Sequence, residues 1–286
     1  MLDVDVKAPP FDQLKGLHRL ATERSGHKSV EHVRHHLFVG RDKSTAANML
    51  VKLTSKPGLV YQQNLSNEIA TLTTINRELP DSRAFPIVVN HGRLPDGRTY
   101  LTTYLFDELP LATTIGTEPN PSRLVANLRT TIAVARALED LHRLSIFHVD
   151  LNPMNILYRS ERSAPVVRII DFESSYETAR HARGEFYNPP TTTGYCAPEI
   201  PDRPPDARAD VFSLGAVLYT LLAGYQWSWK GDVGPMVNDD PSLDGDLRTI
   251  LKTAVHSDAD ARYPTMAALD DAVSGYLESI WPGRAI

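Results

Sequence analysis

The stretch His148-Val149-Asp150-Leu151-Asn152-Pro153-Met154-Asn155, followed further along by Asp171-Phe172, is the most informative part of this chain. Asp171 ends a short apolar run that predicts a strand (Val166, Val167, Ile169, Ile170). Polar side chains beside such a strand cost free energy unless they are bound to something. Carboxylate and amide oxygens are the ligands that hard divalent cations prefer. The spacing therefore predicts that Asp150, Asn155 and Asp171 converge on one charged ligand.

These residues resemble the catalytic loop and the metal-binding motif of the eukaryotic-type (Hanks-type) serine/threonine protein kinase superfamily. Further matching stretches follow in the family's order, over about residues 17 to 278: Met49-Leu50-Val51-Lys52, Gly194-Tyr195-Cys196-Ala197-Pro198-Glu199, Asp210-Val211-Phe212-Ser213-Leu214-Gly215 and Arg262-Tyr263-Pro264-Thr265. One short motif alone is weak, whereas several motifs in one order are specific. The chain therefore looks like a member of this superfamily, of the bacterial type.

The resemblance implies an α+β, bilobal protein-kinase-like fold. Residues 1–104 are expected to form an N-lobe with a small antiparallel sheet and one long helix, which binds the nucleotide. Residues 105–286 are expected to form a mainly helical C-lobe with the catalytic loop, the activation segment and the substrate-binding helices. The lead-in, residues 1–10, is expected to be extended.

Apolar periodicity supports this organisation. Five residues recur at helical spacing in the expected N-lobe (Leu65, Ile69, Leu72, Ile75, Leu79), and Asn64 or Ser66 is expected to cap that helix. A Pro95-Asp96-Gly97 turn predicts a hairpin. The run from Ala209 to Leu222 is nearly apolar all round, which predicts a helix buried on every side.

The resemblance also implies roles in transferring the γ-phosphate of ATP with Mg²⁺ as the cofactor ion. Asp150 would accept or orient the proton of the attacking hydroxyl, and Asn155 and Asp171 would hold the metal. Lys52 would hold the α and β phosphates, and Glu68 would hold the lysine. The expected catalytic set is Asp150, Lys52, Glu68 and Thr192. The expected nucleotide-binding set is Lys52, Leu50, Thr103, Tyr104, Leu105, Asn155 and Asp171.

Several matching residues are expected to be structural. Asp210 should accept hydrogen bonds from catalytic-loop amides, and Glu199 should pair with a buried Arg262. His148 and Phe172 are interpreted as packing residues. Thr192 matches the family threonine that bonds the catalytic aspartate, although it could also be a phosphorylation site.

The chain departs from the family pattern at the nucleotide. Between Arg24 and Leu37 the only glycine is Gly26, so the usual glycine-rich loop is missing. Leu50 replaces a small alanine, which should tighten the base pocket. Both departures predict weaker ATP binding.

The catalytic residues have altered neighbours too. Val149 replaces the arginine that usually pairs with a phosphorylated activation segment, so we expect activity without such a phosphate. Asn152 replaces a lysine that steadies the γ-phosphate. Glu173 replaces a glycine, and could be a further Mg²⁺ ligand or a solvated side chain.

Three function classes fit these residues. The run from Ile169 to Ser175 is similar to choline and aminoglycoside kinases, which phosphorylate small molecules. The missing glycines fit a pseudokinase scaffold. The Ala-Pro-Glu segment, Asp210 and Arg262 favour the preferred function, an ATP-dependent kinase acting on serine or threonine of a protein substrate, because together they build a peptide-binding shelf. Trp227 and Trp229 fit either a docking surface for a partner or core packing.

Composition sets the remaining limits. The 286 residues are 42% hydrophobic, enough to fill a core. A net charge of -5 without a long basic run gives no electrostatic footprint for nucleic acid. No apolar run approaches about 18 residues, and no signal-peptide pattern is visible. We therefore expect a cytoplasmic protein without nucleic acid or membrane as partner. Cys196, the single cysteine, is expected to be a packing residue.

Overall fold

The structure is a computed structural model that describes residues 4–20, 34–116, 120–161, 164–190, 194–200, 202–224 and 233–283. The chain forms two compact units, Met1–Asp107 and Glu108–Ile286, whereas the sequence placed a lobe boundary after residue 104. The predictions for Gly26, Thr192, Trp227 and Trp229 concern residues outside the described ranges.

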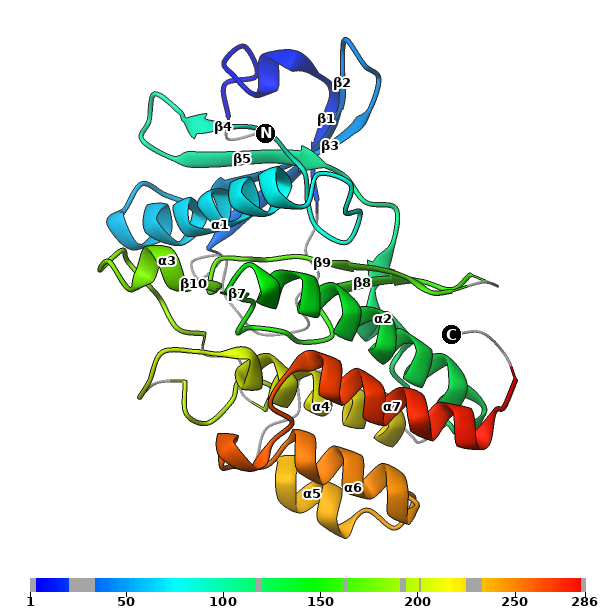
Figure 1. The fold of residues 1–286 in the computed structure, drawn as a ribbon. Helices are drawn as coiled ribbons and strands as arrows, with labels where there is room; N and C mark the ends of the chain where they lie inside the picture. Colours follow the sequence, from blue (N-terminus) through cyan, green and yellow to red (C-terminus); the bar gives the residue numbers. More distant parts are fainter. Residues whose placement is uncertain are drawn as a thin grey trace. The chain divides into compact units, whose positions relative to one another are not determined.

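The first unit is built on a five-stranded antiparallel sheet (Figure 1). Its strands are β1 (Leu14–Arg19), β2 (His35–Asp42), β3 (Asn48–Thr54), β4 (Val88–Arg93) and β5 (Thr99–Tyr104), in the order β1-β2-β3-β5-β4. Because side chains alternate along a strand, Met49, Val51 and Leu53 of β3 share one buried face. Leu50 and Lys52 therefore face the opposite side of the sheet.

The long helix of the first unit, α1 (Leu59–Glu78), packs on β3, β4 and β5. The prediction that Asn64 or Ser66 caps this helix is wrong, since the helix begins at Leu59 with Gly58 as its N-cap. Leu59 and Val60 are exposed, so the first turn does not follow the apolar periodicity on which that prediction rested. Asn64 instead is buried in the helix.

The N-terminal segment is not a simple extended lead-in. Residues 5–10 form turns that lead into a short 3-10 helix, η1 (Phe11–Gln13), before β1. The Phe11 ring is buried and meets Phe38 of β2 edge-on, with ring centroids 5.4 Å apart. Burying an aromatic ring in this way contributes strongly to a small core, and the contact ties the N-terminal segment to β2.

Short strands of the second unit frame the loops that carry the predicted catalytic residues. β7 (Ile146–Phe147) pairs with β10 (Tyr176–Glu177), and β8 (Ile156–Arg159) lies between β6 (Leu109–Pro110) and β9 (Val166–Ile169). The smaller helical elements of this unit are η3 (Leu111–Thr114), η4 (Pro121–Arg123), α3 (Thr178–His181) and η5 (Ala259–Ala261).

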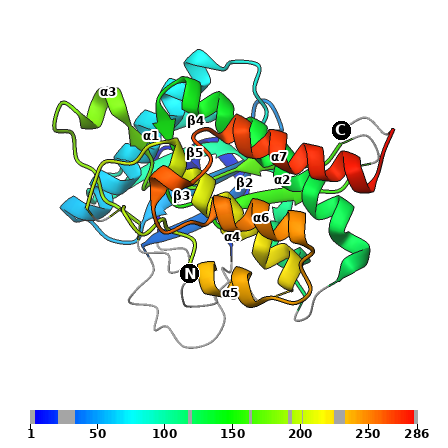
Figure 2. The same ribbon diagram turned by 60° about the horizontal axis from the view of Figure 1, so that its bottom comes forward.

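The longer helices described in the second unit are α2 (Leu124–Arg143), α4 (Ala207–Ala223), α5 (Val233–Asp239), α6 (Gly245–Ala254) and α7 (Met266–Ile280). In both views α2 and α7 lie side by side, and α4 contacts α2, α6 and α7 (Figures 1 and 2). Every residue from Ala209 to Leu221 is buried, so the predicted fully buried helix is confirmed. Among the described residues, no helix combines the length and apolarity needed to cross a membrane.

Gly215 of α4 lies against the end of α6. A Cβ at this position would lie 2.7 Å from Cβ of Ala254 and 3.0 Å from Cγ1 of Val255. Replacing a glycine inside a helix by alanine normally raises the free energy of unfolding by about 0.5–1 kcal/mol. Overpacking a core, in contrast, lowers the free energy of unfolding by about 1–3 kcal/mol.

We therefore predict that Gly215→Ala lowers the free energy of unfolding by about 1–2 kcal/mol. Gly275→Ala in α7 should raise it by about 0.5–1 kcal/mol, since a Cβ there meets nothing within 4 Å. Urea unfolding of both variants checks the pair. Equal shifts in the same direction would contradict the steric argument.

Candidate active site

The loop that carries Asp150 is fastened at its start by a carboxylate from α4. The side chain of Asp210, which is 0% exposed, accepts the backbone N–H of His148 at Oδ2 (2.9 Å) and that of Val149 at Oδ1 (2.7 Å). Val149 has φ 68°, in the left-handed region, which is an outlier for a β-branched residue and costs about 1–3 kcal/mol. The two hydrogen bonds from these backbone amides to Asp210 hold the backbone in place. The predicted role of Asp210 as an acceptor for loop amides is confirmed.

A histidine completes the surroundings of Asp210. Nε2 of His142, in the last turn of α2, lies 2.8 Å from Oδ2 of Asp210. Burial raises the pKa of Asp210, but the hydrogen bond and charge of His142, together with His148 and the Val149 amide, hold this pKa below its usual range. Sequence reasoning missed His142, because its place at the end of an apolar stripe does not show that it turns inward.

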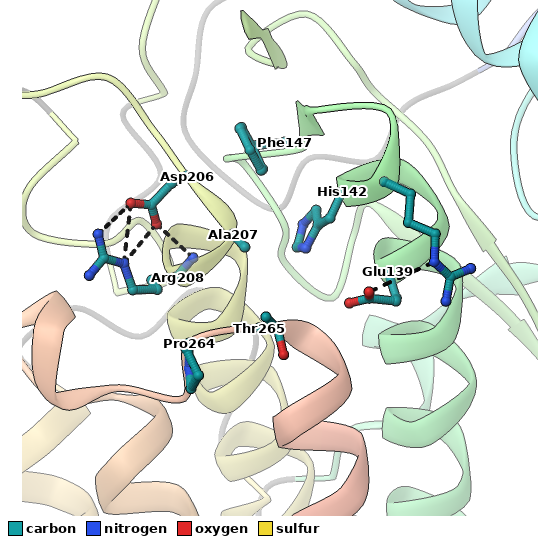
Figure 3. Close-up of a pocket in the computed structure, with 9 residues that line it drawn as sticks. Glu139, His142, Phe147, Asp206, Ala207, Arg208, Pro264 and Thr265 are labelled. Atoms are coloured by element: carbon teal, nitrogen blue, oxygen red, sulfur yellow. Dashed lines mark hydrogen bonds and ion pairs between the residues drawn. The ribbon is translucent and has the colours of Figure 1, made fainter.

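His142 also borders a cavity of about 430 Å³ in the second unit (Figure 3). Charged groups around this cavity are paired with protein groups: Asp206 with Arg208 at 2.6 Å, and Oε2 of Glu139 with the backbone N–H of Ala267 at 3.1 Å. Of the predicted catalytic and metal-binding residues that the structure describes, none lines the cavity.

Within the loop, two asparagines brace the backbone of Asp150. The side-chain nitrogens of Asn152 and Asn155 donate to the carbonyl oxygen of Asp150, at 3.0 and 2.9 Å. Oδ1 of Asn152 accepts the amide of Met154, so this side chain acts as a turn brace. Because Asn155 donates through its nitrogen, its amide oxygen is the atom that could hold a cation.

Strand pairing brings Asn155 next to Asp171. Asn155 immediately precedes β8, Asp171 follows the end of β9, and Ile156 pairs with Ile169 in the antiparallel ladder. The backbone N–H of Ile170 donates to the carbonyl of Asn155 at 2.9 Å. The two predicted metal ligands therefore stand at adjoining ends of one strand pair.

Asp171 and Glu173 form a carboxylate pair after β9. Asp171 has φ 69°, an uncommon conformation that occurs more often for aspartate than for most residues. Carboxylate oxygens of Asp171 and Glu173 lie within 4.8 Å of each other, and Glu173 is 7% exposed. The interpretation of Glu173 as a solvated side chain is therefore wrong.

The rings of His148 and Phe172 pack against each other. Their ring centroids are 4.9 Å apart in an edge-on arrangement, and both residues are 0% exposed. Nε2 of His148 lies 3.0 Å from the carbonyl oxygen of Ile170. These contacts confirm the interpretation of both as packing residues.

In the first unit, Nζ of Lys52 on β3 lies 2.7 Å from Oε2 of Glu68 on α1. The two side chains are 14% and 5% exposed. A lysine held in this way has a fixed ammonium position. The predicted pairing of these two residues is confirmed, while their roles toward a nucleotide remain a proposal.

The predicted base-binding residues lie along β3 and β5. Leu50 pairs with Thr103 in the ladder, and Tyr104 at the end of β5 is 39% exposed. The backbone N–H of Leu105 donates to the carbonyl of Asn48 at 2.9 Å. This bond occupies the amide of Leu105, so contact with a base through that amide would require the bond to break.

The pair formed by Glu199 and Arg262 is a two-pronged ion pair in the second unit. Nη1 and Nη2 of Arg262 reach the two carboxylate oxygens of Glu199 at 2.8 and 2.7 Å. Arg262 also donates to the carbonyl oxygens of His256, Arg208 and Ser257, and its guanidinium lies 4.8 Å from the ring centroid of Phe212. The predicted pairing is confirmed, and the stacking on Phe212 was not predicted.

Cys196 lies beside this pair without the features of a reactive thiol. Burial, followed by the charges of Asp150 and Glu199, raises the pKa of Cys196 to about 12. A thiol with a raised pKa is a poor nucleophile at neutral pH. This agrees with the interpretation of Cys196 as a packing residue.

Comparison with known proteins relates this geometry to one family. A family model described as "Protein kinase domain" matches residues 102–270. Ribosomal protein S6 kinase alpha-2 of Homo sapiens is 38% identical over 94 residues, which are 32% of this chain and 13% of the relative. MAP kinase-activated protein kinase 2 of Oryctolagus cuniculus is 36% identical over 95 residues, 32% of this chain and 25% of the relative. The chain thus spans a small part of these curated relatives.

Solved structures share the fold. The crystal structure of the PknI kinase domain of Mycobacterium tuberculosis matches with a TM-score of 0.57 and 19% identity, covering 85% of this chain and 90% of that one. A double mutant of the same kinase domain matches with a TM-score of 0.59 and 18% identity, over 85% and 91% of the two chains. These likenesses support the fold and its α+β class.

We predict that Arg262→Ala lowers the free energy of unfolding by about 3–5 kcal/mol, because it leaves Glu199 without its buried counter-charge. Arg262→Lys should lose nearly as much, since lysine cannot reproduce the planar fork of donors. Arg143→Ala is the control, because that side chain is 67% exposed, and about 0–1 kcal/mol is expected. Unfolding in guanidinium chloride measures the free energies of unfolding of the three variants. Equal losses in Arg262→Ala and Arg143→Ala would refute the prediction.

Proposed function

The chain belongs to the protein kinase domain family, and from this premise we propose that it transfers the terminal phosphate of ATP to serine or threonine hydroxyls of a protein substrate. The observation that carries the proposal is the anchored loop from His148 to Asn155. Phosphoryl transfer depends on positioning and charge stabilisation more than on covalent chemistry. A loop fixed by Asp210 at one end and by β8 at the other supplies that positioning.

Asp150 is assigned the role of accepting or orienting the proton of the attacking hydroxyl. Its backbone is braced by Asn152 and Asn155, so the carboxylate projects from a fixed point. Proton transfer by a positioned group contributes about 10²–10⁴-fold to rate. Thr192, which lies outside the described residues, is assigned the hydrogen bond to Asp150 that its sequence position implies.

The residues of the second unit fit a bound Mg²⁺ in their chemistry. Asn155 offers an amide oxygen and Asp171 a carboxylate at the adjoining ends of β8 and β9. Oxygen-only ligands with few protein groups suit this cation, which keeps several waters. When bound, Mg²⁺ would neutralise negative charge on the phosphate oxygens. Asn155 and Asp171 are therefore the proposed metal ligands.

The first unit is assigned the nucleotide contacts. Lys52, fixed by Glu68, would bind phosphate oxygens, and Leu50, Thr103, Tyr104 and Leu105 would contact the base. The bond between Leu105 and Asn48 predicts that the carbonyls of this segment, rather than the Leu105 amide, face a bound base in this conformation.

A protein acceptor is proposed because the segment that ends at Glu199 is rigidly supported. Tyr195 is 1% exposed, and its hydroxyl lies 3.0 Å from Oγ1 of Thr220. Its carbonyl oxygen accepts a hydrogen bond from the hydroxyl of Ser213 at 2.7 Å. Arg262 holds Glu199 from the other side. A shelf fixed at two points can bind an extended peptide with little loss of conformational entropy.

The test is incubation of the chain with γ-labelled ATP and Mg²⁺, with myelin basic protein, choline and kanamycin as separate acceptors. We expect label on protein, reduced at least 10²-fold by Asp150→Asn. Asp140→Asn is the matched control, because that carboxylate is 44% exposed on α2, and it should leave transfer unchanged.

Each alternative gives a different result. Label on choline or kanamycin alone would replace the proposal with a small-molecule kinase. Absence of transfer together with absence of ATP binding would indicate a pseudokinase scaffold. A loss below about tenfold in Asp150→Asn would overturn the assignment of Asp150.

A further inference from the structure

The activation segment, defined here as residues 171–199, is held at its beginning by backbone pairing. Tyr176 pairs with Phe147 and Glu177 with Ile146, so β10 lies against the strand that leads into the loop of Asp150. The backbone N–H of Thr178 also donates to the carbonyl of Ser145 at 3.1 Å. The position of this part of the segment is therefore coupled directly to the catalytic loop.

Three rings hold the middle of the segment, and we call Tyr176, His181 and Tyr187 the aromatic clamp. Ring centroids are 4.8 Å apart for Tyr176 and His181, 5.1 Å for Tyr176 and Tyr187, and 5.5 Å for His181 and Tyr187. The first pair is stacked and the other two meet edge-on. Such pairs contribute about 0.5–1.5 kcal/mol each beyond the area they bury.

The hydrogen bonds of His181 suit a neutral ring. Nδ1 of His181 lies 2.9 Å from the backbone nitrogen of Glu177 and 3.0 Å from its carbonyl oxygen, and in the neutral tautomer that carries its hydrogen on Nε2 this nitrogen accepts the Glu177 N–H. Burial, and then the charge of Arg180, lower the pKa of His181. The ring thus packs as an uncharged aromatic group.

Tyr187 joins the clamp through its ring and not through its hydroxyl. The hydroxyl oxygen is buried, and no described residue forms a hydrogen bond with it. Burial raises the pKa of Tyr187 strongly, so the phenol stays neutral. Because a buried hydroxyl without a partner stabilises nothing, phenylalanine should serve at this position at least as well.

The clamp lies within a segment whose phosphate, in the family that the sequence resembles, usually pairs with the arginine that Val149 replaces. Val149 offers no charge for such a phosphate. Arg180, beside the clamp, is bound to Glu177 at 2.6 Å and to Glu185 at 3.3 Å. The guanidinium of Arg180 is thus paired with carboxylates of the activation segment itself.

We propose that Tyr187 is a positioning residue: its ring holds residues 178–187 against Tyr176 of β10, the strand that pairs with β7, and this contact orders residues 176–187 without a phosphate-to-arginine pairing. The inference rests on the proposed kinase function for its effect on rate. Its structural part, the ordering of residues 176–187, stands independently of that function.

The test compares Tyr187→Ala, Tyr187→Phe and, as a matched control, Phe186→Ala, whose ring is 37% exposed and outside the clamp. Amide hydrogen exchange of residues 176–187 should quicken by about tenfold or more in Tyr187→Ala and stay unchanged in the other two. With myelin basic protein as the acceptor, kcat/KM should fall by about tenfold in Tyr187→Ala only, before and after phosphatase treatment.

Three results would overturn the proposal. Unchanged exchange in Tyr187→Ala would show that the ring does not order the segment, and a loss in Tyr187→Phe as large as in Tyr187→Ala would assign the role to the hydroxyl. Activity of the wild type abolished by phosphatase would restore phosphate as the ordering device. If the wild type transfers no phosphate, the proposed function fails, while the exchange measurement still decides the clamp.

Discussion

The buried carboxylate of Asp210 is the fixed point on which the candidate site depends. It fixes the first residues of the catalytic loop through hydrogen bonds from two backbone amides, and it belongs to a stretch of α4, residues 209–221, in which every residue is buried. A buried carboxylate is stable only when its charge is met by donors, so the loop amides and His142 stabilise Asp210 as much as it stabilises them. This mutual requirement explains why Val149 can keep a left-handed backbone, and why Asp150 follows it in a defined position.

Much of this could be predicted from the sequence, because the informative residues stand in ordered motifs. The apolar periodicity predicted the helices. The order of the motifs predicted that Asp210 accepts hydrogen bonds from loop amides, and that Lys52 pairs with Glu68 and Glu199 with Arg262. Charged residues within apolar segments need a partner, and the motif order indicated which one.

Features that depend on packing were not predictable in the same way. His142 and the aromatic clamp involve common residue types whose inward direction is set by tertiary contacts. The apolar periodicity did not predict the start of α1 at Leu59, because the first turn of this helix is exposed. The turns of the N-terminal segment lead to Phe11, whose ring packs on Phe38, and this contact between distant parts of the sequence leaves no local pattern. The bond from Leu105 to Asn48 is a backbone contact that no side-chain pattern reports.

Amide hydrogen exchange at His148 and Val149 tests the anchoring role of Asp210 most directly. In the wild type both amides should exchange as slowly as the interior of α4, because their acceptor is fully buried. In Asp210→Asn the side-chain nitrogen cannot accept an amide hydrogen, so at least one of the two should exchange about 10-fold to 100-fold faster while α4 stays protected. Rapid exchange in the wild type, or unchanged protection of both amides in the variant, would contradict the account.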